Sequence, residues 1–358
     1  MPAAYPPLTG VRKIVVLRPN AVGDFVFALP ALHALKHSYP DATLALAGKD
    51  WHRGFLAGRP GPVDRVIVLP AVPGVGAPPD ARADRDAIEG FLGAMRAEGF
   101  DLALQMFGGG RHSNPFLQRF GARLCVGARA ADAPALARWT AYREPTQRRL
   151  ALLEIAALAG ARPALPPLPE LAVTPADRLE ASTALAPRAG ERLVVLQPGS
   201  TDPRRRWPAS RFAALGDLLA REGARIAVNG SAAEAALVDE VAGRMRAPAT
   251  ALAGRLGLGG LCGLLERAAL LVSNDTGPLH LALALGVPSV GIFWLTNLLE
   301  GMPLRPSLLR AALSVRTRCP VCGHDNLQGR CPHDDSFVAD VGLDEVAGLA
   351  RAVLAGPD

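Results

Sequence analysis

Residues 273–293 read SNDTGPLHLALALGVPSVGIF, and this stretch decides the fold class. The aliphatic run that leads into it, residues 270–273, predicts a strand that ends at Asn274. Pro278 stands where a helix can begin, because the first turn of a helix leaves its N–H groups unused and proline has none. We predict a helix over 278–285 and a second strand over 289–293. Strand, helix and strand in this order are typical of a parallel α/β sheet.

The same region holds the longest run without a charged residue, from 276 to 299. Because this run contains glycines, prolines, a histidine and the polar pair Thr296–Asn297, we interpret it as buried helix and strand rather than as a membrane span. The first ten residues, MPAAYPPLTG, lack the basic start and apolar core of a signal peptide. Five cysteines in 358 residues fit a reducing compartment. We therefore expect a cytoplasmic protein.

Short aliphatic runs alternate with longer amphipathic stretches on both sides of residues 163–169, PALPPLP, which we interpret as a linker. The predicted strands are 13–17, 43–47, 65–69, 102–106 and 124–126 before the linker, and 193–197, 225–229, 270–273 and 289–293 after it. The predicted helices are 24–37, 82–97, 115–120 and 146–158 before it, and 209–221, 232–245, 258–268, 278–285 and 343–354 after it. Two α/β halves follow from this pattern, and ligands of such open sheets bind beyond the carboxyl ends of the strands.

The net charge of +6 is unevenly distributed. Residues 1–175 hold 20 Lys and Arg against 14 Asp and Glu, a difference of +6, whereas residues 176–358 hold 19 of each kind. A basic half can meet a nucleic acid, an anionic membrane or an anionic substrate. Only 5% of the residues are aromatic, and no basic run is interleaved with aromatics, so nucleic acid is the least supported of the three.

The loop after the first predicted strand reads Arg18-Pro-Asn-Ala-Val-Gly-Asp24. Gly23 permits a tight turn, and Asp24 would cap the helix that follows. Alternatively, Asp24 lies at a strand end that faces the cleft, where its carboxylate takes a proton from a hydroxyl nucleophile. The pattern alone leaves both interpretations open.

Two loops of the second half contain the groups that bind phosphate. Residues 197–208, QPGSTDPRRRWP, place hydroxyls and three arginines after a strand, and backbone N–H groups, hydroxyls and guanidinium forks are phosphate ligands. Thr276 and Gly277 place a hydroxyl and bare backbone at a helix N-terminus. The alternatives are a solvated basic loop and a capped helix start with His280 in the core. Two such loops in one half suit a diphosphate.

Two weaker signals complete the set. Glu234, in the stretch NGSAAE over 229–234, could accept hydrogen bonds from a ribose diol, although a glutamate in a first helical turn is favourable in any case. Cys319, Cys322 and Cys331, with two histidines nearby, have the spacing of zinc ligands. Because a second Cys-x-x-Cys is missing, we expect an ordered loop with free thiols, without metal, and no cofactor.

Together these stretches resemble the bacterial heptosyltransferases of glycosyltransferase family 9, which build the inner core of lipopolysaccharide. The resemblance runs from about residue 13 to residue 354 and includes the cysteine cluster. It rests on four stretches in this order: KIVVLRPNAVGDFVFALPALHALKHSYP (13–40), LQPGSTDPRRRWP (196–208), NGSAAE (229–234) and SNDTGPLHLALALGVPSVGIF (273–293).

The resemblance implies the GT-B fold, an α/β architecture in which two Rossmann-like domains face a cleft and the C-terminal helix returns to the first domain. We accordingly expect an acceptor domain over 1–168, a donor domain over 169–340 and the returning helix over 341–358. The implied reaction is an inverting, metal-independent transfer from ADP-heptose, or a related nucleotide sugar, to an anionic lipid-linked saccharide. Peripheral contact with the inner face of the inner membrane is expected, and a nucleic-acid partner is not.

Residue patterns and resemblance together assign the site. Asp24 matches the catalytic base. The expected donor contacts are Ser200, Thr201, Arg205, Glu234, Asp275, Thr276, Gly277 and His280. Arg18 and Arg111 follow strand ends of the basic half, so we expect both to face the cleft and bind the anionic acceptor.

Two departures from the family pattern bear on the substrate. Arg205 stands where a lysine usually precedes x-Trp-Pro, and a guanidinium fork replaces a point charge there. Trp294 and Leu295 stand where many members have a Phe-Gly-Pro-Thr turn, which leaves the sugar open. The alternative functions are therefore transfer of another nucleotide-activated sugar, and nucleotide-sugar binding without catalysis.

Overall fold

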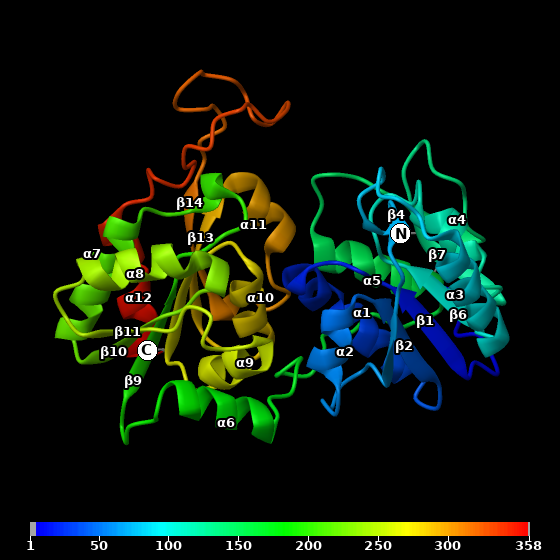
Figure 1. Cartoon of the computed structure of the whole chain (residues 1–358), viewed down its shortest axis with the longest axis horizontal. Coiled ribbons are helices and arrows are strands. Elements are labelled where there is room, and N and C mark those ends of the chain that lie inside the picture. Colours follow the sequence, from blue (N-terminus) through cyan, green and yellow to red (C-terminus); the bar gives the residue numbers. More distant parts are fainter. Residues whose placement is uncertain (1–4, 357–358) are drawn as a thin grey trace. The chain divides into compact units, whose positions relative to one another are not determined.

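The computed structural model describes residues 5–356 and divides the chain into two compact units, Met1–Ala172 and Val173–Asp358. The division falls just after the proline-rich residues 163–169, which form neither helix nor strand. Each unit contains its own parallel sheet with helices on both faces (Figure 1). In the part of the chain that the structure describes, no helix is both long enough and apolar enough to cross a membrane.

The first unit is built on a six-stranded parallel sheet with the order β3-β2-β1-β6-β7-β8. Its strands are β1 (Lys13–Leu17), β2 (Thr43–Gly48), β3 (Arg65–Val68), β6 (Leu102–Gln105), β7 (Leu124–Arg129) and β8 (Arg138–Ala141). Its helices are α1 (Val22–Ser38), α2 (Asp50–Leu56), α3 (Arg85–Glu98), α4 (Ser113–Gln118) and α5 (Arg148–Leu158). Helices α3 and α4 cover one face, and α1 and α5 cover the other (Figure 1). After Lys13, the central strand β1 is aliphatic and buried, as expected for a strand that is covered on both faces.

The second unit repeats this arrangement with the order β11-β10-β9-β12-β13-β14. Its strands are β9 (Arg192–Gln197), β10 (Ala224–Val228), β11 (Ala249–Ala251), β12 (Leu270–Asn274), β13 (Ser289–Trp294) and β14 (Leu309–Ser314). Its helices are α6 (Pro175–Ala184), α7 (Ala209–Arg221), α8 (Ala235–Arg244), α9 (Leu258–Glu266), α10 (Gly277–Ala284), α11 (Leu295–Gly301) and α12 (Leu343–Ala355). Short 3₁₀ turns are η1 (Pro203–Arg205), η2 (Ala232–Glu234) and η3 (Pro306–Leu308).

The last helix corrects one expectation. The buried residues of α12 are Val346, Ala347 and Ala350, and they join the core that α7 and the β9–β14 sheet form. The apolar face of α12 is therefore buried within the second unit, and the prediction that this helix returns to the first domain is wrong. An amphipathic pattern shows that a face is covered, but it does not identify the covering element.

Other differences lie in short elements. Residues 70–79, rich in proline and glycine, contain a minimal pair of strands that lies outside the predicted strands, β4 (Val72–Pro73) and β5 (Gly76–Ala77). The uncharged run over residues 276–299 forms α10 and β13 and ends in helix α11. The prediction that this run is buried helix and strand is confirmed for α10 and β13. Asp84 caps α3 by accepting a hydrogen bond from the Ala87 N–H at 3.0 Å, so the Asp84-Arg-Asp86 triplet belongs to a helix start.

Both sheets have the same topological switch point. The chain winds outward in one direction from β1 to β3, and in the other direction from β6 to β8. In the second unit the corresponding central pair is β9 and β12. At a switch point the loops beyond the two central strands diverge and leave a crevice, where open α/β sheets bind their ligands. The loops after β1, β6, β9 and β12 therefore hold the candidate site residues.

Candidate functional site

The loops after β9 and β12 are joined by an amide that the sequence patterns did not single out. Asn274 is fully buried at the end of β12. Its Oδ1 accepts a hydrogen bond from the Trp207 N–H at 3.0 Å, and its Nδ2 donates to the Pro198 carbonyl at 2.7 Å. Asn274 thus closes both ends of the loop after β9 onto β12. An amide at the end of an otherwise aliphatic strand was the available signal.

A second link between these loops is an ion pair. The Arg205 guanidinium, carried by η1, lies 3.1 Å from Asp275 Oδ2, and His280 Nε2 lies 3.0 Å from Asp275 Oδ1. The Asp275 side chain is only 7% exposed, whereas that of Arg205 is 26% exposed. Three predicted residues from η1, β12 and α10 are therefore brought together. Asp275 holds Arg205 at the switch point while the guanidinium keeps a face toward solvent.

Polar groups without partners surround this pair. Ser200 is 1% exposed, and its Oγ has no hydrogen-bond partner in the described residues; the same holds for Arg205 Nε. Thr276 is the N-cap residue of α10 and makes no side-chain capping bond, and Gly277 begins the helix. A buried hydroxyl, a guanidinium N–H and the start of a helix are the groups that an anion would satisfy. Thr201 is exposed in the same loop.

Glu234 lies against the loop after β9. Its Oε2 accepts hydrogen bonds from the Ser231 N–H at 2.8 Å and the Ser231 hydroxyl at 2.9 Å, which forms a capping box. A Cβ atom placed on Gly199 would overlap Glu234 Oε1. The Glu234 carboxylate therefore lies directly against Gly199, and a side chain at 199 would have to displace it. The interpretation of Glu234 as a glutamate in a first helical turn is confirmed. Its carboxylate also lies against Gly199, in the loop after β9 that is predicted to bind the donor.

In the first unit, Asp24 lies in the first turn of α1 with its side chain 40% exposed. The N-cap residue is Ala21, so the interpretation of Asp24 as the helix cap is wrong. The Arg18 guanidinium donates to the Asp24 carbonyl at 2.9 and 3.1 Å, lies 3.3 Å from Asp24 Oδ1, and also donates to the Met106 carbonyl. Arg18 thereby ties the loop after β1 to the loop after β6.

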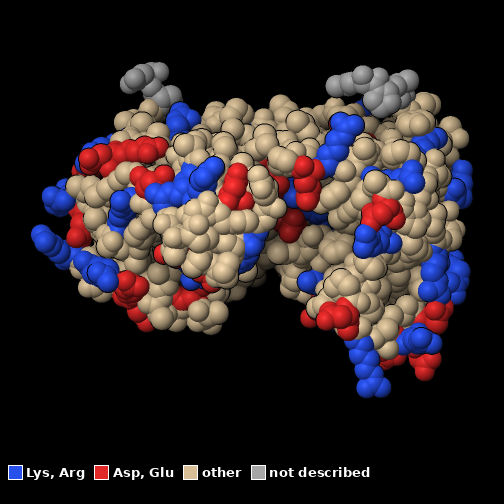
Figure 2. Space-filling model, turned by 90° about the horizontal axis from the view of Figure 1, so that it is seen from above, with Lys and Arg blue, Asp and Glu red and all other residues tan. Residues whose placement is uncertain are grey.

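Arg18 itself is 5% exposed, and burial lowers its pKa to about 10 although the Asp24 carboxylate acts in the opposite direction. A guanidinium enclosed in this way holds the backbone of Asp24, and the expected contact of Arg18 with the acceptor stays a prediction. Arg111 is exposed and pairs with Asp132, and its contact with the acceptor stays a prediction. On the face drawn in Figure 2, Lys and Arg lie among Asp and Glu, and no continuous basic patch covers the first unit.

Trp294, where the sequence departs from the family pattern, packs against the segment between β14 and α12. Its ring centroid is 5.0 Å from that of Phe337, and its Nε1 donates to the Arg316 carbonyl at 2.5 Å. The helix that follows, α11, ends at Gly301, where an added Cβ would lie 3.0 Å from His280 Cε1. The departure therefore places a helix beside His280, where many members have a turn.

The comparisons with known proteins agree with this geometry. Residues 91–321 match the model of glycosyltransferase family 9 (heptosyltransferase). The chain is 27% identical over 306 residues to lipooligosaccharide heptosyltransferase 2 of Haemophilus influenzae, covering 80% of this chain and 84% of that one. A relative in Salmonella typhimurium, lipopolysaccharide heptosyltransferase 2, is 27% identical over 301 residues, covering 78% of this chain and 82% of that one.

Solved structures share the fold over nearly the full length. A family 9 glycosyl transferase from Veillonella parvula superposes with a TM-score of 0.76 at 18% identity, covering 97% of this chain and 98% of that one. The ADP-heptose lps heptosyltransferase II of E. coli gives 0.72 at 18% identity, covering 96% and 98%. The two Rossmann-like sheets are thus those of the GT-B fold, and the resemblance seen in the motifs is confirmed. The chain belongs to glycosyltransferase family 9, the heptosyltransferase family, and is a glycosyltransferase.

Proposed function

We propose that this glycosyltransferase moves a heptose from ADP-heptose to an anionic, lipid-linked saccharide of the lipopolysaccharide inner core. The transfer is a single inverting displacement without a catalytic metal. The observation that carries the donor assignment is the Arg205–Asp275 pair at the switch point of the second unit, surrounded by Ser200 and the start of α10. The family relatives are heptosyltransferases, which supports heptose as the sugar.

The diphosphate is bound by the loops after β9 and β12. Arg205 supplies a charged fork, Ser200 and Thr201 supply hydroxyls, and Thr276 and Gly277 supply N–H groups at the positive end of α10. As the bond to the sugar breaks, negative charge grows on the departing phosphate, and fixed donors at this position stabilise it.

The remaining donor residues act beside the diphosphate. Glu234 takes the ribose hydroxyls through the oxygen that faces Gly199, since its other oxygen is engaged by Ser231. Asp275 and His280 form a buried pair, and we assign them to positioning Arg205 and to the sugar end of the site.

The catalytic base is Asp24. In a single displacement, one carboxylate removes the proton of the acceptor hydroxyl while that oxygen attacks the anomeric carbon, and the nucleoside diphosphate leaves from the opposite face. The exposed Asp24 carboxylate is available for this, and Arg18 fixes the backbone that carries it. Arg111 contacts the anionic acceptor, at the cytoplasmic face of the inner membrane.

A second candidate is transfer of a different nucleotide-activated sugar. It is favoured by helix α11, which packs Gly301 against His280 where the family pattern has a turn. The donor end that meets the sugar is thereby rebuilt, while the diphosphate loops are retained.

Turnover of purified full-length protein tests the proposal. ADP-heptose and other nucleotide sugars are each incubated with a heptose-deficient lipooligosaccharide acceptor, without added divalent metal, and the product is identified by mass spectrometry. We expect transfer of heptose with inversion at the anomeric carbon. Transfer of another sugar alone supports the second candidate, and binding of ADP-heptose without turnover by any donor supports a non-catalytic protein.

Substitution of Asp24 tests the base. Asp24→Asn should lower kcat by roughly 10²–10⁴-fold with ADP affinity unchanged, because only the proton acceptor is lost. The matched control is Asp86→Asn, which removes an exposed acid from the first turn of α3 and so reproduces any effect on a helix terminus. Near-wild-type turnover of Asp24→Asn contradicts the assignment.

A further inference from the structure

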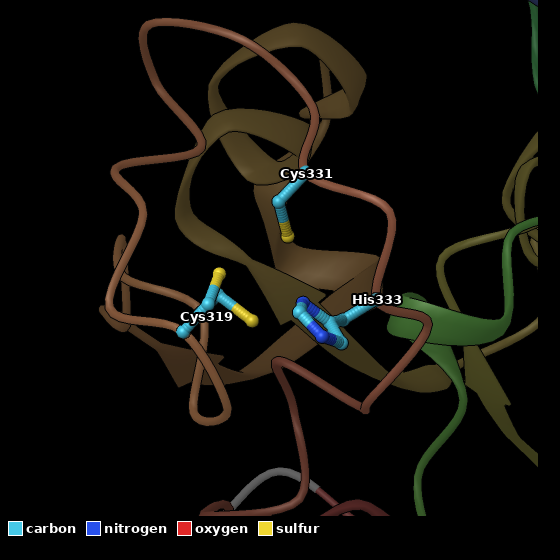
Figure 3. A group of neighbouring side chains, drawn as sticks. Cys319, Cys331 and His333 are labelled. Atoms are coloured by element: carbon cyan, nitrogen blue, oxygen red, sulfur yellow. The ribbon is translucent and has the colours of Figure 1, made fainter.

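Four potential metal ligands converge in the segment between β14 and α12, residues 315–342, called here the cysteine loop. One ligand atom from each of Cys319, Cys322, Cys331 and His333 lies within 4.8 Å of all the others. Figure 3 shows the side chains of Cys319, Cys331 and His333 directed toward one another. The cysteines are unpaired, and they are separated along the chain as C-x₂-C-x₈-C-x-H.

The donor set fits a tetrahedral transition-metal ion. Zinc binds cysteine sulfur at about 2.3 Å and histidine nitrogen at about 2.0 Å, so the ligand atoms of a tetrahedral site lie about 3.5–3.8 Å apart. The present separations reach that spacing with shifts of about 1 Å. His333 Nδ1 is buried and has no hydrogen-bond partner in the described residues, which leaves it free to bind.

Apart from its C-terminal end, the cysteine loop has little regular secondary structure and few buried side chains to hold it in place. Within the described chain its regular structure is one isolated bridge, between Arg318 and Asp325. Its C-terminal end is anchored, because Val338 and Val341 are buried in the core of the second unit, but over residues 315–336 of the described chain the buried side chains are those of Cys319 and Cys331, which pack with Phe337 and Trp294. So few buried side chains offset little of the entropy lost on ordering such a segment, and a bound metal ion supplies the missing free energy in comparable small sites.

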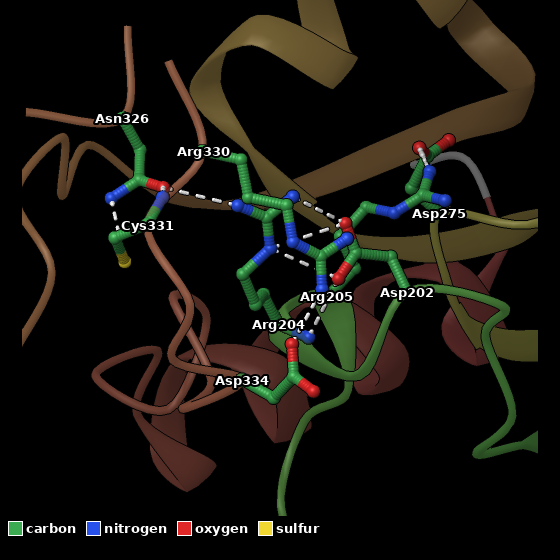
Figure 4. A network of polar contacts seen from close by, with 8 residues as sticks. All are labelled: Asp202, Arg204, Arg205, Asp275, Asn326, Arg330, Cys331 and Asp334. Carbon is green, nitrogen blue, oxygen red and sulfur yellow. Dashed lines mark hydrogen bonds and ion pairs between the residues drawn. The ribbon is translucent and has the colours of Figure 1, made fainter.

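The same loop reaches the predicted diphosphate site. Asn326 Oδ1 accepts from the Arg204 guanidinium at 3.1 Å and from the Cys331 N–H at 3.3 Å (Figure 4). The Phe337 N–H donates to the Arg204 carbonyl at 2.7 Å, and the Ser336 hydroxyl donates to the Arg206 carbonyl at 2.6 Å. Arg205 lies between these two carbonyls in sequence, so its backbone is fixed on both sides by the cysteine loop.

We propose that Cys319, Cys322, Cys331 and His333 bind one transition-metal ion, with zinc as the expected occupant, and that this ion braces the loop that carries Arg205. Four protein ligands fill a tetrahedral site, so no position is left for substrate or water and the ion is structural. The metal site replaces the expectation of a metal-free loop. The effect of the metal ion on donor affinity rests on the proposed function of Arg205, whereas the existence of the metal site does not.

Elemental analysis of the full-length protein, purified without added metal or chelator, tests the site. We expect close to one zinc ion per chain, released by a mercurial that blocks thiols. Cys322→Ser should abolish this content, and because Cys322 is exposed the change leaves the packing of the buried cysteines intact. Cys125→Ser, which removes a cysteine of the first unit, is the matched control and should retain the metal.

One equivalent of iron in place of zinc supports the site and changes its occupant. Metal retained by Cys322→Ser contradicts the ligand set. A wild-type chain that contains no metal, and takes up none when zinc is titrated into the chelator-treated protein, overturns the proposal without reference to any variant.

ADP binding measured by calorimetry tests the brace. Cys322→Ser and Asn326→Ala should each weaken ADP by roughly threefold to tenfold, since a hydrogen bond to a charged group is lost or loosened. Only Asn326→Ala should keep its metal. The control in the same loop is Leu327→Ala, an exposed side chain, which should change ADP affinity by less than about twofold.

Unchanged ADP affinity in both Cys322→Ser and Asn326→Ala refutes the brace and leaves the metal site standing. A wild-type chain that does not bind ADP refutes the proposed donor function and the brace with it, while the metal content still decides the site.

Discussion

Replacing Arg205 by alanine should weaken ADP binding far more than adenosine binding. Under the proposed function Arg205 contributes in two ways: its guanidinium faces the diphosphate, and it neutralises Asp275 at 3.1 Å. A charge-assisted hydrogen bond to phosphate contributes about 1.5–3 kcal/mol, or roughly 10–150-fold in Kd. These terms act at the phosphate and not at the nucleoside.

The second contribution comes from the carboxylate that remains. Asp275 is 7% exposed, and without Arg205 its negative charge would face the diphosphate. Two unit charges about 6 Å apart repel by about 3 kcal/mol at an effective dielectric constant near 20, and solvent at this partly open site reduces the effect to about 1 kcal/mol. The combined loss for Arg205→Ala is then roughly 100-fold for ADP.

A double-mutant cycle separates the two contributions. Isothermal titration with ADP and with adenosine is performed on the wild type, Arg205→Ala, Asp275→Asn and the double variant. The double variant should bind ADP roughly five- to tenfold more tightly than Arg205→Ala, because the unpaired carboxylate is gone. Arg221→Ala, which removes an exposed arginine at the end of α7, serves as the charge-matched control. Equal losses for ADP and adenosine in Arg205→Ala would refute the contact with phosphate.

Three further outcomes are expected. Gly199→Ala should weaken ADP and lower the melting temperature, since its Cβ displaces the Glu234 carboxylate at a cost of about 1–3 kcal/mol; normal ADP affinity would contradict the assigned place of Glu234. Burial lowers the pKa of His52 to about 4. The free energy of unfolding that neutral His52 contributes is therefore fully present above about pH 6.5, and roughly 2 kcal/mol of it is lost as the pH falls toward 4. His52→Asn should flatten this pH dependence of thermal unfolding. Arg111→Ala should raise KM for the acceptor with donor affinity unchanged, and binding to anionic vesicles should weaken with salt; acceptor kinetics that do not change would remove Arg111 from the site.

The strand ends could be predicted from the sequence because both faces of each central strand are covered. The centres of β1, β9 and β12 are aliphatic runs that end at polar residues, and in a parallel sheet those ends share one edge. Hence Asp275 and Arg205, which are distant in sequence, could be expected close together, as the structure has them. Which carboxylate oxygen meets which partner depends on side-chain packing, and no spacing rule encodes it.

Other features depend on contacts that a linear pattern does not carry. The apolar stripe of α12 fits either sheet equally well, and the second core has the space that receives it. Asn274 is one amide in an aliphatic strand, and its two loop contacts arise from the closure of residues 198–207. The spacing of the cysteines pointed to a zinc site, but it did not tell which of the two nearby histidines would be the fourth ligand, and the structure places His333 there.

The three consecutive arginines after β9 show why a charge run can be misread as a solvated face. Arg204 donates to Asp202, and these hydrogen bonds lower the pKa of Asp202 although burial opposes this. Arg206 donates to the Ser200 carbonyl at 2.9 Å. Arg206 is thus engaged within its own loop, and Arg204 bonds both to Asp202 and to Asn326 of the cysteine loop. Of the three, Arg205 combines a partner across the switch point with an N–H group left unpaired in the described structure. Repulsion among three guanidinium groups is relieved by giving each a separate acceptor. Under the proposed function, Arg205 is the one guanidinium of the run that binds the anion, and its two neighbours shape the loop that carries it.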